Sequence, residues 1–393
     1  MTPLPRRRAF ANSAGRSFSP LPAALLAIAL LAGLTAPAPS VSGPRPCPAG
    51  RCTGFEWQPL GDGIYAAIRR EPPGLLEHAN SLVIVNDADV VVVDSQMTPR
   101  ATREVIRAIR EVTGKPVRYV INTHWHDDHV FGNAAYALAY PGVEFVSSSA
   151  TRADLATLGR DNRGAFVAAL PDELRLMNRH LARQTTLDWR DLARDGQPLD
   201  PAGRRSLLSS IAQAQAYLSE EPATPVLLPG VIVDSELVLH RGAREIHVVC
   251  LGSAHTRGDV VVWLPREGVL AAGDVVSGIV PMASGTTDLA AWSRALHRLD
   301  GLAPRVVVPG HGPVASGDEL LLRTTRLLDA VRERTAAAYR PGAALADVQA
   351  GVQLDDLRRS WSDDEPMREL LFVLFFEQPA IASAYRNLAA PGS

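Results

Sequence analysis

The stretch Asn122-Thr-His-Trp-His-Asp-Asp-His129 decides how this sequence is interpreted. Within six residues it carries four side chains able to bind a metal ion: His124, His126, Asp128 and His129. Imidazoles and carboxylates crowded at the end of an apolar run are costly to desolvate unless something binds them. Imidazole and carboxylate donors together suit zinc. The stretch therefore predicts a metal site, with a chance cluster on the surface as the alternative.

Three further candidate ligands occur later in the chain, each where an expected strand ends: His255, Asp274 and His311. Side chains delivered from several strand ends to one edge of a sheet form a rigid site. Their presence disfavours the chance cluster. We therefore expect all seven side chains to meet at one place.

Strand-like runs occur in two sets. The first set contains β-branched, apolar runs: 64–68, 81–85, 90–94 and 117–121. The segment 99–112 between them has apolar residues at helical spacing. The second set follows later: 232–239, 245–251, 260–264, 268–272 and 305–308. Strands that alternate with helices predict an α/β layered domain.

Between the two sets lie about 75 residues, 150–225, whose apolar residues recur at helical spacing. We interpret them as a helical insertion. After the last strand, a C-terminal helical extension of residues 317–393 is expected, with helices at 317–340 and 365–388. The apolar faces of these helices suit a wall of the substrate cleft, a lid or a dimer contact, and the sequence leaves the oligomeric state open.

The first 38 residues have the pattern of a signal peptide. Arginines at 6–8 precede the apolar run 23–34, and Ala36-Pro-Ala38 resembles a cleavage site. Arg7-Arg8-Ala9-Phe10 also resembles a twin-arginine export signal. An uncleaved membrane anchor is the alternative. We expect a periplasmic or secreted protein with no stable membrane span once the signal is cleaved.

Residues 39–58 are rich in Pro, Gly and Ser, and we expect a linker there. Cys47 and Cys52 could close a small loop by a disulfide in an oxidising compartment. Cys250 lies in an apolar run and is expected to be a buried small side chain. The formal net charge of −2 gives no basis for a nucleic-acid partner, because neutralising phosphates requires a basic surface.

Four motifs in order resemble those of the metallo-β-lactamase superfamily: His-x-His-x-Asp-His at 124–129, His-Thr-x-Gly at 255–258, Gly-Asp at 273–274 and Gly-His-Gly at 310–312. The resemblance covers residues 59–316, interrupted by the helical insertion. It implies a four-layer αββα sandwich and two zinc ions. Residues 122–133 also resemble exported members found beside quinoprotein dehydrogenase systems.

The resemblance further implies the ligand sets. His124, His126 and His255 would bind one metal, Asp128, His129 and His311 the other, and Asp274 would bridge them. Asp94 matches an aspartate that supports the site from outside the ligand set. The implied reaction is attack by a hydroxide that bridges the metals on an ester, thioester, lactone or amide carbonyl of a small molecule, with Asp128 also holding the hydroxide and taking up its proton.

Three other functions are weighed against this hydrolase. A true β-lactamase usually has Cys or Ser in place of Asp274, and with Lys115 as the lone lysine an arginine such as Arg257 would have to hold the substrate carboxylate. The expected export nevertheless favours contact with antibiotics. A persulfide dioxygenase of the same fold would use a single iron instead. A protein that only binds is least expected, because closed structural zinc sites carry four protein ligands each.

The remaining histidines differ in what they predict. Four lie in helical or strand patterns and are expected to be ordinary surface or packed residues: His180, His240, His247 and His297. His78 lies in a loop beside Asn80 that could reach the site, and the sequence leaves its role open.

Overall fold

The computed structural model describes residues 54–69, 78–185, 198–199, 201–220, 224–362, 368 and 372–390. The expected signal peptide and the Cys47–Cys52 pair lie outside the described residues. Within the described ranges, no helix is both long enough and apolar enough to span a membrane.

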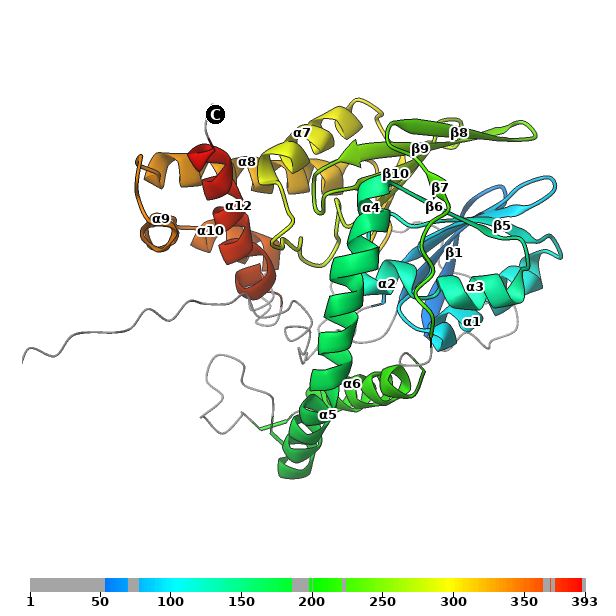
Figure 1. The fold of residues 1–393 in the computed structure, drawn as a ribbon, viewed down its shortest axis with the longest axis horizontal. Coiled ribbons are helices and arrows are strands. Elements are labelled where there is room, and N and C mark those ends of the chain that lie inside the picture. The colour runs from blue at the N-terminus through cyan, green and yellow to red at the C-terminus, as the bar shows by residue number, and fades with distance from the viewer. Residues whose placement is uncertain are drawn as a thin grey trace, which may run out of the picture.

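Seven strands form the first sheet, in the order of the chain (Figure 1). They are β1 (Phe55–Gly61), β2 (Ile64–Arg69), β3 (Ser81–Val85), β4 (Val90–Val93), β5 (Val117–Ile121), β6 (Glu144–Ser147) and β7 (Val231–Ile232). Neighbours from β1 to β4 are antiparallel, and those from β4 to β7 are parallel. The parallel part brings the carboxyl ends of β4 and β5 to the same edge.

Six strands form the second sheet, in the order β13-β12-β11-β10-β9-β8. They are β8 (Glu236–Arg241), β9 (Arg244–Gly252), β10 (Asp259–Leu264), β11 (Val269–Gly273), β12 (Val306–Pro309) and β13 (Ala315–Ser316). Strands β11 and β12 pair in parallel, so the residues that follow them leave the sheet side by side.

The predicted four-layer arrangement is confirmed. One apolar cluster lies between the sheets and draws on both of them, for example through Ile84 and Val262. Helices α1 (Pro99–Val112) and α3 (Asn133–Ala139) pack on the outer face of the first sheet. Helices α7 (Leu289–Asp300) and α8 (Glu319–Ala338) pack on the second. Because both faces of each sheet are covered, central strands such as β4 are buried along their whole length.

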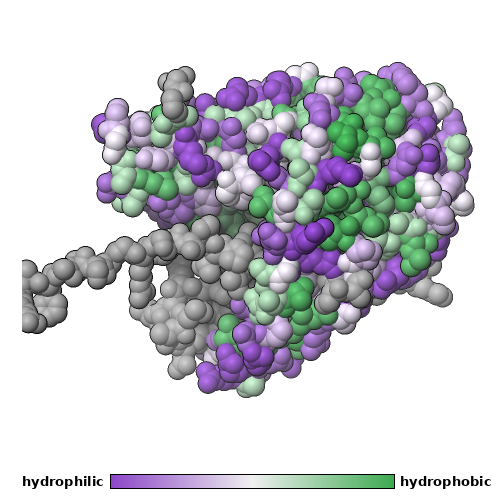
Figure 2. Space-filling view, in the orientation of Figure 1, coloured by the Kyte–Doolittle hydropathy of each residue, from purple (hydrophilic) through white to green (hydrophobic). Residues whose placement is uncertain are grey.

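Helices also occupy the expected insertion: α4 (Ser149–Asp154), the π-helix η2 (Leu155–Gly159), α5 (Arg160–Arg183) and α6 (Pro201–Glu220). Helix α5 runs away from the sandwich and packs against α6, with the rings of Phe166 and Tyr217 5.0 Å apart (Figure 1). The far tip of α5 is mostly hydrophilic (Figure 2). After α8 come α9 (Leu345–Gly351), α10 (Asp355–Ser362), the π-helix η4 (Phe372–Glu377) and α12 (Gln378–Ala389).

Three strand predictions need correction. Strand β1 begins at Phe55, so the end of the expected 39–58 linker belongs to the sheet, where Phe55 and Trp57 bury their rings. Strand β6 was not predicted, since its four residues are too few for a clear alternation. The expected strand 232–239 is two strands in different sheets.

The chain changes sheets between β7 and β8. The N–H of Val233 still donates to the carbonyl of Ser147 in the first sheet, whereas the carbonyl of Ser235 accepts from Cys250 in the second. Between them, the Asp234 carboxylate accepts from the N–H of Ser149 and fixes the crossing. A continuous apolar pattern cannot reveal such a change of partner.

Candidate metal centre

The loop that follows β5 gathers four of the predicted ligands. The short helix α2 (Asp127–Val130) turns the chain back directly after His126. The ring of His124 consequently lies 4.6 Å from that of His126 and 4.1 Å from that of His129, between centroids. The buried Asn122 fixes the turn, because its amide donates to the carbonyl of His129 at 2.8 Å.

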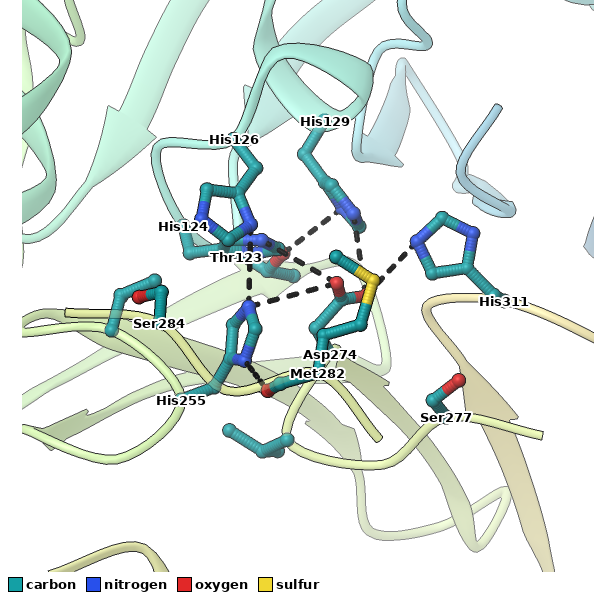
Figure 3. Close-up of polar contacts among 12 residues, drawn as sticks. Thr123, His124, His126, His129, His255, Asp274, Ser277, Met282, Ser284 and His311 are labelled. Atoms are coloured by element: carbon teal, nitrogen blue, oxygen red, sulfur yellow. Dashed lines mark hydrogen bonds and ion pairs between the residues drawn. The ribbon is translucent and has the colours of Figure 1, made fainter. Parts of the chain in front are cut away.

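The three ligands predicted from the second sheet meet this loop (Figure 3). Among the residues that the structure describes, the donor atoms form two groups, in each of which they lie within 4.8 Å of one another. The first group is His124, His126, His255 and Asp274, and the second is Asp128, His129 and His311. All seven predicted ligands are therefore brought together.

Asp274 stands between the two groups. Its Oδ2 lies 3.7 Å from Nε2 of both His124 and His255. Its Oδ1 lies 3.3 Å from Nε2 of His129 and 3.4 Å from Nε2 of His311. One carboxylate oxygen thus faces each group, which is the arrangement that a bridging ligand requires. Glycine is needed at position 310, because a Cβ there would overlap the Asp274 carboxylate.

The donor atoms fit a bound cation. Four of them are buried and have no hydrogen-bond partner: Nε2 of His124, Nε2 of His129, Oδ2 of Asp128 and Oδ1 of Asp274. Native proteins rarely leave so many polar atoms unsatisfied in one place. Metal ions would satisfy them, so the residues present fit a pair of metals.

The protonation of the first donor group also favours a metal. Desolvation, reinforced by His255, lowers the pKa of His126 to about 3, and desolvation holds the pKa of His124 well below its usual value. Desolvation opposes ionisation of Asp128 and Asp274, but the neighbouring histidines outweigh it and hold both pKa values well below the usual range. Neutral imidazoles and ionised carboxylates are the forms that bind metals. In the second group the neighbouring carboxylates outweigh desolvation and raise the pKa values of His129 and His311 well above the usual value, so a metal bound there would displace protons.

Sequence comparison decides the family. The family model described as the metallo-beta-lactamase superfamily matches residues 75–311, more than half of the chain. The chain belongs to this superfamily. Together with the two donor groups, this match shows a metal-dependent hydrolase domain.

Two curated relatives are similar over parts of their length. The metallo-beta-lactamase type 2 of Bacteroides fragilis is 30% identical over 137 residues, which are 34% of this chain and 54% of that protein. The linear primary-alkylsulfatase of Pseudomonas sp. (strain ATCC 19151) is 23% identical over 277 residues, 68% of this chain and 47% of that protein. The chain thus spans about half the length of the curated relatives it matches.

Solved structures give weaker similarity. A metallo-beta-lactamase from Pontibacter korlensis is 20% identical with a TM-score of 0.47, covering 70% of this chain and 99% of the other. The metallo-beta-lactamase FIM-1 from Pseudomonas aeruginosa in its mono-zinc form is 17% identical with a TM-score of 0.47, covering 70% and 96%. The superfamily assignment rests on the sequence match and not on these scores.

Within the superfamily site, Asp94 orients His129. Its Oδ2 lies 2.7 Å from Nδ1 of His129, and the carboxylate also accepts from the backbone N–H and the hydroxyl of Thr123 at 2.8 and 2.9 Å. Asp94 is buried and adopts a φ of 60°, a left-handed conformation that aspartate tolerates better than most residues. A carboxylate on one ring nitrogen leaves the other free for a metal.

A different kind of partner orients His255. Its Nδ1 donates to the backbone carbonyl of Met282 at 2.8 Å, which leaves Nε2 facing Asp274 (Figure 3). The hydroxyl of Thr287 holds the backbone of His255 through its carbonyl at 2.7 Å. Sequence reasoning missed Met282, because a carbonyl contact leaves no trace in residue type.

Asn80 holds the His311 loop. Its side-chain amide donates to the carbonyls of Pro309 at 2.9 Å and Gly312 at 2.8 Å, and its backbone N–H donates to the carbonyl of Gly310 at 2.7 Å. These bonds join the start of β3 to the loop after β12. They fix the position of His311 from the first sheet.

His78 belongs to neither donor group, but it is close enough to Asp128 and His311 for their charges to affect its pKa. It is 8% exposed, and its Nδ1 is buried without a hydrogen-bond partner. Burial and the charge of Arg69 lower its pKa well below the usual value, against the opposing charge of Asp128. The ring is therefore a neutral imidazole beside the metal site.

The other histidines lie outside both groups, as predicted. Each of these has a partner elsewhere: His180 with Thr185, His240 with Glu245, His247 with Glu236 and His297 with Asp329. Cys250 is half-buried in β9 rather than fully buried, with a free thiol.

The two cationic side chains considered for substrate binding, Arg257 and Lys115, both already bind other residues of the protein. Arg257 pairs through both Nε and Nη2 with the buried carboxylate of Asp154, with the Nε distance at 3.0 Å. Lys115 donates to the carbonyl of Asn86 at 2.7 Å. A substrate carboxylate would have to compete with these partners.

Proposed function

We propose that this protein is an exported hydrolase that uses two zinc ions to cleave an ester, thioester, lactone or amide of a small molecule. The observation that carries the proposal is the position of Asp274, whose two oxygens face two separate groups of histidines. Imidazole and carboxylate donors suit zinc. The signal-like pattern of residues 1–38 supports export.

Zinc ions bound to the two groups would polarise the scissile carbonyl and lower the pKa of a bound water to about 7. The protein supplies the rest of the chemistry. Oδ2 of Asp128 lies 3.2 Å from Nε2 of both His129 and His311, so this oxygen is held on the ligand side. The other oxygen, Oδ1, is left to accept the proton that the nucleophile loses. His78 offers a neutral imidazole that can donate to the substrate from the side of the second group.

β-Lactam hydrolysis is the second candidate, and the similarity to the Bacteroides fragilis metallo-beta-lactamase supports it. Two observations rank β-lactam hydrolysis below the more general hydrolase proposed above. An aspartate stands at 274, and Arg257 is committed to Asp154. A dioxygenase with a single iron is disfavoured, because two complete donor groups provide for two metals.

A substrate screen with the metal-loaded protein tests the proposal. The panel includes a chromogenic β-lactam, simple lactones, glutathione thioesters, carboxylic esters and a primary alkyl sulfate, and metal content is measured on the same sample. We expect about two zincs per chain and turnover of at least one carbonyl substrate, with Asp128→Asn as the inactive control. One iron per chain, or no turnover across the panel, would contradict it.

A further inference from the structure

We propose that the C-terminal helices α10, η4 and α12 are a positioning element of the metal centre, which they act on through His255. The superfamily match ends at residue 311, so these helices lie outside it. The inference rests on the proposed metal-binding function. It gives a function to three helices that contribute no metal ligand.

The connection is a chain of two hydrogen bonds through one peptide group. The carbonyl of Phe375 in η4 accepts from the N–H of Ala283 at 2.8 Å. The same peptide group carries the carbonyl of Met282, which accepts from Nδ1 of His255 at 2.8 Å. Hydrogen bonds in series polarise one another, so the first bond strengthens the second.

The sequence explains why the Phe375 carbonyl can make this bond. In an α-helix it would accept from the N–H of the residue four positions later. That residue is Pro379, which has no N–H. The helix here is a π-helix that passes into α12 at Gln378. The carbonyl therefore lacks its α-helical donor and is available to Ala283.

Several more bonds attach the same loop, residues 275–288, to the C-terminal helices, and two of them come from buried side chains. The indole N–H of Trp361 in α10 donates to the carbonyl of Ile279 at 3.0 Å. The hydroxyl of Ser383 in α12 donates to the carbonyl of Thr287 at 2.7 Å, and the hydroxyl of Thr287 in turn holds the backbone of His255. Trp361 and Ser383 are 4% and 1% exposed, so water does not compete for these bonds.

The expected consequence falls mainly on one metal. Removing a partner that orients a histidine ligand typically weakens metal binding by 10- to 100-fold. His255 belongs to the first donor group alone. Loosening the loop should therefore weaken the first metal more than the second, because Asp94 and Asn80 also hold the second group and, among the described residues, the loop hydrogen-bonds to it only at the backbone, for example through the N–H of Gly278 on the carbonyl of His311.

The test is Pro379→Ala in the full chain. The new N–H at position 379 lets this turn close as an α-helix, in which the Phe375 carbonyl accepts from residue 379 in competition with Ala283. Stepwise Co²⁺ titration of the metal-free protein, followed by calorimetry and visible absorption, should show the first group weakened by about 10-fold and the second clearly less affected. Pro341→Ala, at an exposed turn between α8 and α9, is the matched control.

Trp361→Phe is a second variant, because it keeps the aromatic packing and removes the bond to Ile279. We expect a smaller loss at the first group, about 3-fold. Wild-type affinity at both groups in both variants, or an equal loss at the two groups, would overturn the inference. If the variants weaken the first metal but the wild-type protein cleaves nothing, the inference stands and the proposed hydrolysis fails.

Discussion

The two halves of the metal centre are built in different ways. The half from the first sheet is one continuous loop, 124–129, whose His129 is oriented by a buried carboxylate. The half from the second sheet comes from three separate strand ends, and its His255 is oriented by a neutral peptide carbonyl. The half from the first sheet is local in sequence and is oriented by a charged group, whereas the half from the second sheet depends on distant segments.

This difference predicts which substitutions will disturb each half of the site. Asp94 forms its bonds within the first sheet, so the first half keeps its shape as long as β4 and β5 stay paired. The second half needs Asn80 from the first sheet and Phe375 from the C-terminal helices. We therefore expect substitutions in the second half to act over longer distances.

The largest effect is expected where the halves join. Asp274→Ala removes the oxygens that face both groups, so metal content should fall from about two to below one per chain. Charge stabilisation by such a centre amounts to several kcal/mol, so turnover should fall by about 1,000-fold or more. Metal analysis and kinetics on the same samples measure both. Retention of two tightly bound metals would show that the halves do not depend on their bridge.

Asp94→Asn tests the local half. Asparagine keeps the shape and tolerates the left-handed backbone, but it loses the charge that orients His129. Affinity of the second group should fall by about 10- to 100-fold with the first group less affected. Asp89→Asn, at the opposite end of β4, is the matched control. Equal losses in the two variants would mean that the effect is general destabilisation.

Asn80→Ala tests the long-range link to His311. It removes two side-chain hydrogen bonds to the His311 loop and leaves buried carbonyls unpaired, which should cost about 1–3 kcal/mol of unfolding free energy. The second metal should bind about 10-fold more weakly. Denaturant unfolding and metal titration measure the two effects, with Asn86→Ala, just after β3, as the control. Unchanged metal affinity would show that Asn80 does not position His311 for metal binding.

The smallest effect is expected from His78→Gln. The ring borders the second group but is not a ligand, so metal content should stay at the wild-type level. Loss of one hydrogen bond to the substrate, about 1 kcal/mol, should lower kcat/KM by about 5- to 10-fold. His180→Gln, in α5, is the control. A loss of metal instead would make His78 part of the ligand shell.

The ligands could be predicted because each clue is local. Histidine and aspartate right after apolar runs mark strand ends, and strand ends of one layer meet at an edge. Asp94, which follows β4 directly, and the four layers were instead implied by the resemblance to the metallo-β-lactamase superfamily that these motifs carry. The engagement of Arg257 could not be predicted, because Asp154 lies about a hundred residues away in an inserted helix.

The sequence alone determined which side chains are the candidate metal ligands, since that choice depends on donor chemistry and on spacing along one strand or loop. The tertiary structure decided how those side chains are held. Met282 and Phe375 contribute only backbone carbonyls, and the sheet change between β7 and β8 depends on which strand lies alongside. Backbone groups are the same in every residue, so only the fold can say which of them meet.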